Sequence, residues 1–374
     1  MPYDIQTAHI FKFLLLSPFF LKSLSHYLHS NEYSNDALDK QNQYLLYSNS
    51  KKNPFKESDN VKIKYIESKP TKWHFLVLKD LKEEKADIFF APTSYIIPAF
   101  APKTIRVIVT VHDLVAFLFP GTHNAKAMII ERLTLKKALK KASDIFVVSD
   151  NTKKDLLDRF KYSEQRIHIT SCAASQVFSN PVSEDELNKF KQDKKLPDRF
   201  ILAVGTLEPR KNFSTLIKSF VNIKKWHPEY KLVIVGKKGW KFDQIESSLK
   251  EYNMEDEIIF PGYLKDEDLQ KMYKLAAVFV FPSLYEGFGI PPLEAMASGC
   301  PVVSSNLASL PEVVGEAGLL IDPKNAYKMA DAISSLIKND NVRNMMIERG
   351  YIQAEKFKWE NSAKTALSVF QSNQ

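Results

Sequence analysis

Cysteine is scarce in this chain of 374 residues, which contains only Cys172 and Cys300. Two cysteines so far apart make no disulfide framework and suit a reducing compartment. No histidine or cysteine pair has the spacing of a zinc site, so we expect no metal of that kind. The rest of the composition, 44% hydrophobic and 26% charged, is ordinary for a soluble globular protein, and the length favours two domains.

Glycine is also rare, with 11 residues, none of which precedes Gly121. Two glycine-rich nucleotide-binding fingerprints are missing. The chain has no G-x-x-x-x-G-K-[ST], which excludes a P-loop ATPase. Neither "VGTLEPRKN" (204–212) nor "IVGKKG" (234–239) matches G-x-G-x-x-G, so a dinucleotide redox cofactor is unsupported.

The apolar stretch "IFKFLLLSPFFL" (10–21) is too short to span a bilayer and is interrupted by Lys12 and Pro18. It lacks the basic start and the small-residue cleavage site of a signal peptide. We expect it to form a buried element or an edge that touches a membrane.

The positive charge is confined to the first half of the chain. Residues 1–180 contain 26 Lys and Arg against 18 Asp and Glu, whereas residues 181–374 contain 26 of each. A basic half points to nucleic acid, an anionic membrane surface or an anionic substrate, and a lysine-rich solvated face is an equal alternative. No interleaving of basic and aromatic residues supports nucleic-acid binding, so we expect no such partner.

Short apolar segments alternate with helical patterns along most of the chain. The expected strands are 44–48, 61–66, 86–92, 105–113 and 143–150 in the first half, then 200–205, 231–236, 257–262, 278–283, 301–305 and 318–322. Helices are expected at 132–142, 212–226, 266–276 and 325–338, and again within 341–374. This alternation predicts an α/β protein with two doubly wound parallel sheets, in which ligands bind at the carboxyl ends of the strands, in the cleft between the domains.

The charged, irregular passage 179–200 is the expected linker. It separates an N-terminal domain (1–180) from a C-terminal domain (198–350). The remaining residues, 351–374, are expected to form a helix that packs back on the N-terminal domain.

The stretch "LYEGFGIPPLEAMASGCPVV" (284–303) places two glycines and Glu286 between an expected strand and a helix that also holds Glu294. Free backbone N–H groups at such a turn can meet an anion, and carboxylates can accept hydrogen bonds from sugar or ribose hydroxyls. At the end of another strand, Arg210 and Lys211 precede a helix, which favours a diphosphate, although surface charges beside a helix cap would look the same.

These motifs resemble the retaining family-4 glycosyltransferases of the GT-B fold. The hallmark E-x7-E of that family is matched by "EGFGIPPLE" (286–294) with its flanks, and "VTVHDL", "VGTLEPRKN", "FPGYL" and "SLPEVVGEAGLLIDP" follow the family's order. The resemblance covers roughly residues 86–360 and implies two Rossmann-like domains. It also implies a cytoplasmic hexosyltransferase, either soluble or peripheral on the inner face of the plasma membrane.

The resemblance also implies roles for individual residues. Arg210 and Lys211, after Gly205, would hold the diphosphate of a nucleotide-sugar donor, and Glu294 would hold its ribose. Gly262 and Tyr263 would flank the nucleobase through backbone contacts. His112 and Glu286 would act at the transferred sugar, together with the backbone amides of four residues: Gly287, Phe288, Gly289 and Ile290. The side chains of Tyr285 and Phe288 are expected to pack in the core.

The implied reaction moves a sugar to an acceptor hydroxyl with retention, in the synthesis of a cell-envelope polysaccharide such as lipopolysaccharide, on a glycan or lipid-linked acceptor. The family generally needs no metal or other cofactor, and no D-x-D motif stands between the expected strands. GDP-mannose is the first expectation for the donor, and a UDP-sugar is the alternative.

The sequence departs from the family at its start, because "MPYDIQTAHIFKFLLLSPFF" lacks the usual glycine loop. A non-catalytic GT-B protein that binds a nucleotide-sugar or a partner is therefore the alternative function.

Overall fold

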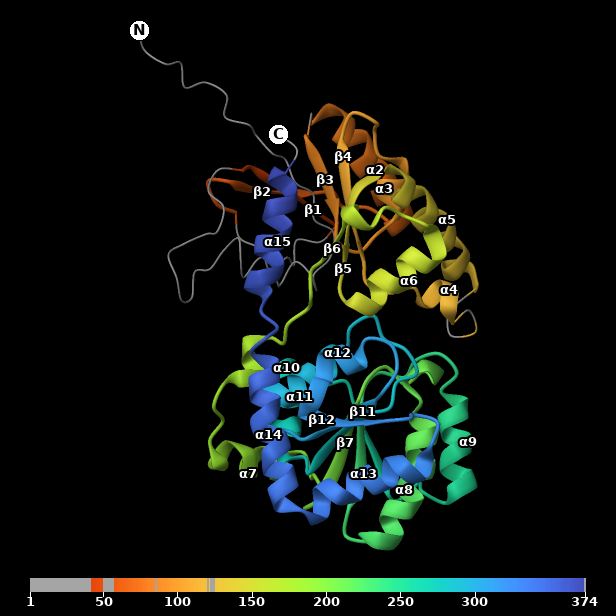
Figure 1. Ribbon diagram of the computed structural model, residues 1–374, viewed down its shortest axis with the longest axis vertical. Coiled ribbons are helices and arrows are strands. Elements are labelled where there is room, and N and C mark those ends of the chain that lie inside the picture. Colours follow the sequence, from red (N-terminus) through yellow and green to blue (C-terminus); the bar gives the residue numbers. More distant parts are fainter. Residues whose placement is uncertain (1–41, 50–56, 85, 120, 122–124, 373–374) are drawn as a thin grey trace. The chain divides into compact units, whose positions relative to one another are not determined.

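The computed structural model describes residues 42–49, 57–84, 86–119, 121 and 125–372. They form two compact units (Figure 1). Unit 1 comprises the chain up to Val148, Thr152–Ser171 and the C-terminal segment from Trp359, and unit 2 comprises Ser149–Asn151 and Cys172–Lys358. The apolar stretch 10–21 lies outside the described residues. None of the helices in the described part of the chain is long and apolar enough to cross a membrane.

The described residues of unit 1 form two parallel sheets. Strands β1 (Tyr44–Ser48) and β2 (Val61–Tyr65) pair with each other, and the second sheet has the order β3-β4-β5-β6. Its strands are β3 (Ile88–Ala91), β4 (Arg106–Val111), β5 (Ala142–Val147) and β6 (Ile167–Ile169). The helices are α2 (Pro70–Glu83), α3 (Ile96–Phe100), α4 (Val115–Leu118), α5 (Ala125–Lys141), α6 (Asp150–Phe160) and α15 (Trp359–Gln371), with a 3-10 turn at Glu164–Arg166. The five strands predicted in this half are present, and β6 was missed because it has only three residues.

The four-stranded sheet is buried on both faces, as the continuous apolar runs of its strands predict. Phe89 and Ala91 point to one face, where they pack with residues of α2, α3 and α5. Ile88 and Phe90 point to the other face, where they pack with Phe370 and its neighbours on α15 and with residues of β1 and β2. Adjacent residues of a strand point to opposite faces of the sheet, so one short strand contributes side chains to the packing on both faces.

Helix α15 is also tied to the sheet by Arg106 at the start of β4. The guanidinium donates to the backbone carbonyls of Val369 (2.9 Å) and Phe370 (3.2 Å), which lie at the C-terminal end of α15. It pairs at the same time with Asp144 at 2.7 Å. Burial alone would raise the pKa of Asp144, but hydrogen bonds from Arg106, Ser143 and His168 outweigh it and lower that pKa. A cation at the last carbonyls of a helix also interacts favourably with the helix dipole.

Unit 2 contains one parallel sheet of six strands. They are β7 (Phe200–Val204), β8 (Lys231–Val235), β9 (Ile258–Gly262), β10 (Val278–Phe281), β11 (Val302–Ser305) and β12 (Gly318–Ile321). The helices are α7 (Glu184–Asp193), α8 (Phe213–Trp226), α9 (Asp243–Tyr252), α10 (Asp266–Leu275), α11 (Ile290–Ala297), α12 (Leu310–Val314), α13 (Ala326–Lys338) and α14 (Asp340–Ala354). Short 3-10 turns lie at Gln176–Ser179, Pro209–Lys211 and Gly315–Ala317. All six strands predicted in this half are confirmed.

The strand order of this sheet is β12-β11-β10-β7-β8-β9. The chain therefore starts in the middle at β7, winds outward through β8 and β9, and returns to β10 on the other side of β7. This is the order of a doubly wound dinucleotide-type sheet, and its switch point lies between β7 and β10. Helices α8 and α13 lie on one side of the sheet and α10 and α11 on the other (Figure 1).

The prediction that 179–200 is an irregular linker is wrong. Within it, α7 begins at a capping box, in which Ser183 accepts from the backbone N–H of Glu186 and the Glu186 side chain accepts from that of Ser183. Phe190 is buried on this helix, and the whole passage belongs to unit 2. The S-x-x-E pattern was the signal for this helix, and the high charge of the passage concealed it.

Candidate active site

The switch point of unit 2 brings two loops together. One follows β7 and contains Arg210 and Lys211, and the other follows β10 and contains Glu286. The two strands are hydrogen-bonded neighbours, so the loops leave the sheet side by side at its carboxyl end. Arg210 and Lys211 are more than seventy positions from Glu286 in the sequence, but the order of the strands places their loops next to each other.

Asn212 fastens the first loop to the rest of unit 2. Its backbone is left-handed (φ 60°), a conformation that asparagine adopts more readily than most residues, and it starts α8 directly after the short turn of Arg210 and Lys211. Its side-chain amide donates to the carbonyls of Pro282 (3.1 Å) and Pro323 (2.8 Å). The backbone N–H of Leu284 in turn donates to the carbonyl of Arg210 at 2.9 Å. The two loops are therefore held in one fixed arrangement.

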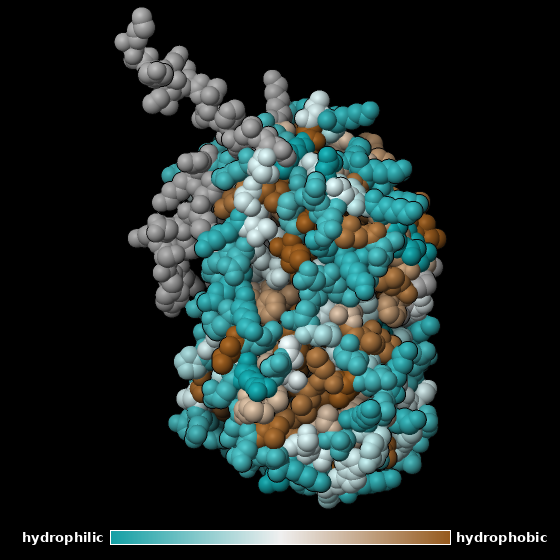
Figure 2. Space-filling model, in the orientation of Figure 1, coloured by the Kyte–Doolittle hydropathy of each residue, from teal (hydrophilic) through white to brown (hydrophobic). Residues whose placement is uncertain are grey.

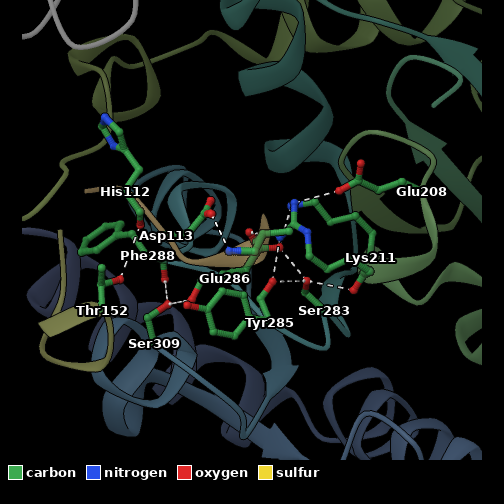
Figure 3. A network of polar contacts seen from close by, with 12 residues as sticks. His112, Asp113, Thr152, Glu208, Lys211, Ser283, Tyr285, Glu286, Phe288 and Ser309 are labelled. Atoms are coloured by element: carbon green, nitrogen blue, oxygen red, sulfur yellow. Dashed lines mark hydrogen bonds and ion pairs between the residues drawn. The ribbon is translucent and has the colours of Figure 1, made fainter. Parts of the chain in front are cut away.

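Glu286 is the centre of a compact charged cluster (Figure 3). One carboxylate oxygen lies 2.6 Å from the Lys211 ammonium and the other 2.8 Å from the Arg210 guanidinium. The Ser283 hydroxyl donates to the same carboxylate at 2.5 Å. Arg210 also pairs with Glu208 at 2.8 Å and donates to the carbonyl of Tyr285. The cluster thus holds two cations and two carboxylates, all of them mostly buried.

The cluster fixes the charge state of Glu286. Burial by itself would raise the pKa of this carboxyl, but Lys211 and Arg210 outweigh burial and hold the pKa below its ordinary value. Glu286 is therefore ionised at neutral pH. Its carboxylate is the counter-ion of both cations in the absence of another anion.

The turn after Glu286 is fixed by hydrogen bonds to Ser309 and by the backbone of Gly289. Ser309 lies within hydrogen-bond distance of the carbonyls of Glu286 (2.9 Å) and Phe288 (2.5 Å), which ties the turn to the start of α12. Gly289 precedes α11 with a φ of 115°, and a Cβ there would lie 2.7 Å from Leu310. Only glycine fits this position. The expected packing roles of Tyr285 and Phe288 are confirmed, since both side chains are 5% exposed.

Glu294 lies on α11, apart from the cations. Its carboxyl accepts a hydrogen bond from the hydroxyl of Tyr273 on α10 at 3.2 Å, and Tyr273 is fully buried. Burial raises the pKa of Glu294 to about 7, with a smaller contribution from Asp266, while the bond from Tyr273 opposes the rise. The two glutamates of the E-x7-E motif therefore differ in charge state, because only Glu286 has cationic neighbours.

This difference predicts a pH dependence of stability. A carboxyl whose pKa is higher in the folded than in the unfolded state binds more protons when folded, so its contribution to stability is lost as pH rises from about 4.5 to about 7. Replacing Glu294 by Gln mimics the protonated form and removes this loss. We expect Glu294→Gln to be more stable than the native chain at pH 8 by on the order of 1–3 kcal/mol, and about equally stable at pH 4. Urea denaturation at both pH values measures it, and an equal difference at the two values would contradict the shifted pKa.

The ends of β8 and β9 leave backbone accessible at the same edge of the sheet. Gly262 has a φ of 82°, and no atom lies within 4 Å of where its Cβ would be. Tyr263 is 63% exposed, with the Lys237 ammonium 4.7 Å from its ring centroid. At Gly236 a Cβ would lie 1.9 Å from the carbonyl oxygen of Gly205, so the strand ends of β7 and β8 can approach each other only with glycine.

His112 belongs to unit 1, directly after β4. Its Nε2 lies 2.5 Å from the carbonyl oxygen of Pro92, which can only accept, so Nε2 carries the proton. Burial lowers the pKa of His112 against the opposing effects of Pro92 and Asp113. The imidazole is therefore neutral and fixed in orientation at neutral pH. Next to it, Asp113 accepts from the backbone N–H of Val115 at the start of α4.

Four side chains of the site were missed in the sequence. Glu208 and Asn212 stand within the quoted "VGTLEPRKN", and Ser283 is the last residue of the expected strand 278–283. Their position beside the named residues was therefore an available signal. Tyr273 had no such signal, because it reaches Glu294 only through the packing of α10 against α11.

Two family models match the chain in succession: "Glycosyltransferase Family 4" over residues 43–174 and "Glycosyl transferases group 1" over residues 184–353. The chain is 34% identical over 292 residues to O-antigen chain mannosyltransferase B of Escherichia coli, covering 78% of this chain and 75% of that protein. The chain belongs to the group 1 glycosyltransferases. This glycosyltransferase is also 29% identical to the serotype-specific mannosyltransferase WbdA of Escherichia coli, of which it spans only 33%, and to the O-antigen chain mannosyltransferase RfbU of Salmonella typhimurium, of which it spans 65%.

Solved structures resemble the whole glycosyltransferase. Sucrose-phosphate synthase from Thermosynechococcus elongatus matches with a TM-score of 0.75 at 20% identity, covering 97% of this chain and 98% of that one. Anabaena HepE, solved in complex with UDP and glucose, matches with a TM-score of 0.76 at 16% identity, covering 97% and 100%. The fold is therefore GT-B, with two Rossmann-like α/β domains, as predicted.

Proposed function

We propose that this glycosyltransferase transfers mannose from GDP-mannose to an acceptor hydroxyl, with retention at the anomeric carbon, during synthesis of a cell-envelope polysaccharide. The mannosyltransferase relatives that act on O-antigen chains support the sugar and the pathway class. The single observation on which the proposed sugar transfer rests is the pairing of Arg210 and Lys211 with Glu286 at the switch point of unit 2.

The two cations are the proposed site of the donor diphosphate. In the described structure their charge is balanced by Glu208 and Glu286. A diphosphate would replace Glu286 as the partner of Lys211, and the released carboxylate would then accept hydrogen bonds from hydroxyls of the transferred sugar. Glu208 would keep its bond to Arg210 and hold the guanidinium in place. Charged donors positioned before the reaction lower the energy of a developing anion without reorganisation.

The other contacts follow from the strand ends. The backbone amides of Gly287, Phe288, Gly289 and Ile290 at the N-terminus of α11 would meet sugar or phosphate oxygens. Glu294 would hold the ribose, and Gly262 with Tyr263 would flank the guanine. We retain His112 as a residue for the transferred sugar. Its neutral ring suits a hydrogen-bonding role rather than charge stabilisation.

We propose a front-face substitution. The bond between the anomeric carbon and the diphosphate oxygen breaks, the acceptor oxygen bonds to the same face of that carbon, and the acceptor proton passes to the leaving diphosphate. Arg210 and Lys211 would stabilise the diphosphate as its negative charge develops. This chemistry requires no divalent metal, and we expect transfer to proceed in the presence of EDTA. In the described part of the chain, no three His, Cys, Asp or Glu side chains form a group that could hold a metal.

Thermal denaturation with a panel of GDP, UDP, GDP-mannose, UDP-glucose and UDP-N-acetylglucosamine tests the donor site. A ligand at about one hundred times its dissociation constant stabilises the fold by about 2.7 kcal/mol, so we expect GDP and GDP-mannose to raise Tm by several degrees. Glu294→Ala should lose the shift, whereas Glu316→Ala, at an exposed glutamate of the same unit, should keep it. A rise in Tm with the UDP compounds alone would show that the nucleobase of the donor is uracil and not guanine.

The transfer itself is tested with GDP-mannose and a mannose-containing acceptor. We expect a product whose anomeric configuration, read by NMR, equals that of the donor. A nucleotide-dependent shift in Tm without turnover on any acceptor or donor would favour the non-catalytic alternative. Inversion of configuration would refute the proposed mechanism.

A further inference from the structure

Helix α14 packs against both helices that adjoin the turn at 286–290, which is proposed to bind the transferred sugar and is called the sugar turn below. The sugar turn ends at the first residue of α11. Ser309, which bonds to the carbonyls of Glu286 and Phe288, directly precedes α12. Helix α14 contacts α11 and α12, and these two contact each other. The three helices therefore form one packed group next to the sugar turn.

The buried side of α14 differs from an ordinary apolar helix face. Met346, Gly350 and Gln353 are buried, whereas Met345 and Ile352 are 42% and 65% exposed. In Figure 2, brown residues interrupt the teal surface at the left of the lower part, where Figure 1 draws α14. A helix placed only to bury apolar surface would show the reverse pattern. The contacts of the buried glycine and glutamine therefore need a separate explanation.

Gly350 and Gln353 fit α14 to the two helices beside the sugar turn. A Cβ at Gly350 would lie 3.4 Å from the side chain of Met296 on α11. Glycine is less favourable than alanine inside a helix, and here it allows α14 to approach α11 closely. The side-chain amide of Gln353 donates to the carbonyl of Val313 on α12 at 3.0 Å and accepts from the Lys356 ammonium at 2.9 Å. These contacts fix the end of α14 relative to α11 and α12.

Phe357 continues the same side of α14 as far as the sugar turn. Its backbone N–H donates to the carbonyl of Ala354, the last residue of the helix, at 3.1 Å. Gly350, Gln353 and Phe357 recur at intervals of three and four residues, which places them on one side. The ring of Phe357 meets that of Phe288 edge to face, with the centroids 5.4 Å apart and an angle of 82° between the planes. This is a preferred geometry of aromatic pairs, so each ring favours one orientation of the other.

We propose that Phe357 is a positioning residue for sugar transfer, an inference that rests on the proposed function of the sugar turn. Phe288 is held by its carbonyl, which lies 2.5 Å from the Ser309 hydroxyl, and by its buried side chain, which packs against Phe357. Loss of the Phe357 ring would leave a gap beside Phe288 and allow the peptide groups of the sugar turn to shift. A displacement of about 1 Å at a reacting group can slow a reaction by about 10²-fold.

Positioning of the sugar can be separated from binding of the nucleotide. The diphosphate is proposed to bind at Arg210 and Lys211, and the ribose at Glu294. A shifted sugar turn should therefore weaken the binding of GDP-mannose and slow the transfer, with little effect on GDP. If Phe357 only stabilised the fold, its loss would lower Tm and would weaken the binding of both ligands alike.

Three substitutions at Phe357 in the full chain test the inference, with steady-state kinetics for kcat and calorimetric titration for Kd. We expect Phe357→Ala to lower kcat at least about tenfold and to weaken GDP-mannose binding at least about threefold, while the Kd of GDP stays within about twofold of native. Phe357→Leu keeps most of the apolar volume without the ring and should lower kcat at least about threefold. Phe357→Tyr keeps the ring and should restore kcat to within about twofold of native.

Tyr327→Ala is the matched control, because it also removes one ring of an edge-to-face pair in unit 2. Tyr327 on α13 pairs with Trp226 at 5.8 Å between centroids, and α13 lies on the other side of the sheet from α11 (Figure 1). This change should leave kcat and both Kd values within about twofold of native. Measured Tm values show which variants are folded, and Phe357→Leu decides the test if Phe357→Ala does not fold.

A folded Phe357→Ala or Phe357→Leu chain with native kcat would overturn the inference. So would a parallel loss of GDP and GDP-mannose binding, or a Phe357→Tyr chain as impaired as Phe357→Ala. Failure of the proposed function gives a different result, because the native chain itself would then transfer no sugar. If it still binds GDP-mannose, the ratio of the two Kd values tests Phe357 without turnover, and if it binds no nucleotide-sugar, both proposals are wrong. If the native chain uses a UDP-sugar, that sugar and UDP replace GDP-mannose and GDP, with the same expected changes.

Discussion

Replacing Lys211 by alanine is expected to lower the turnover of sugar transfer by about 10²–10³-fold, the usual effect of removing one positioned charge from a developing anion. The ammonium lies 2.6 Å from Glu286 and is mostly buried, so water cannot replace it well. It is also fixed in place, since its stem runs beside Gly205 and its charge lies 4.9 Å from the centroid of the Phe281 ring. Steady-state kinetics with saturating donor measure the effect.

Lys218→Ala is the matched control, because this lysine is exposed on α8, seven residues after Lys211. It should leave turnover within about twofold of native. Removing Lys211 also leaves Glu286 with one cation fewer, so Tm must be measured for both variants. A variant Lys211→Ala that is folded and turns over at the native rate would show that this lysine does not stabilise the leaving diphosphate.

Replacing Glu286 by glutamine is expected to reduce turnover by about 10²-fold while GDP binds at least as tightly as before. The carboxylate is the counter-ion of both cations in the described structure, so it competes with the diphosphate for them. Its removal frees Lys211 for the nucleotide, whereas the sugar loses its charged acceptor. Calorimetric titration with GDP and a turnover assay on the same sample separate the two effects.

Glu316→Gln, at an exposed glutamate of unit 2, is the control and should change neither quantity. If Glu286→Gln loses GDP binding and turnover in equal proportion, the carboxylate acts by holding the cations in place and makes no separate contact with the sugar. A loss of turnover without a loss of GDP binding is what distinguishes a catalytic residue from a positioning one.

The fold was largely predictable because its elements are local. Each strand of unit 2 is a short apolar run, and the buried stripe of α8 recurs at helical spacing. The passage at 179–200 was misjudged because a polar helix such as α7 buries little beyond Phe190, so the hydrophobic pattern is weak there. The capping box was the remaining signal.

The site was predictable only in part. The residue types and spacing of "EGFGIPPLE" and "VGTLEPRKN" pointed to anion and hydroxyl binding, and the resemblance to a family supplied roles. The mutual pairing of Arg210, Lys211 and Glu286 could not be read from the sequence. It depends on β7 and β10 being neighbours in the sheet, and parallel strand order is a non-local property.

The sequence by itself therefore determined the class of protein, the two sets of strands and the identity of the charged residues at their ends. Only the tertiary structure decided their charge states. Glu286 and Glu294 are the same residue type eight positions apart, yet the pKa of Glu286 is lowered and that of Glu294 is raised to about 7. The reason is physical: burial disfavours both carboxylates, and chain packing brings two cations to the first and a tyrosine hydroxyl to the second.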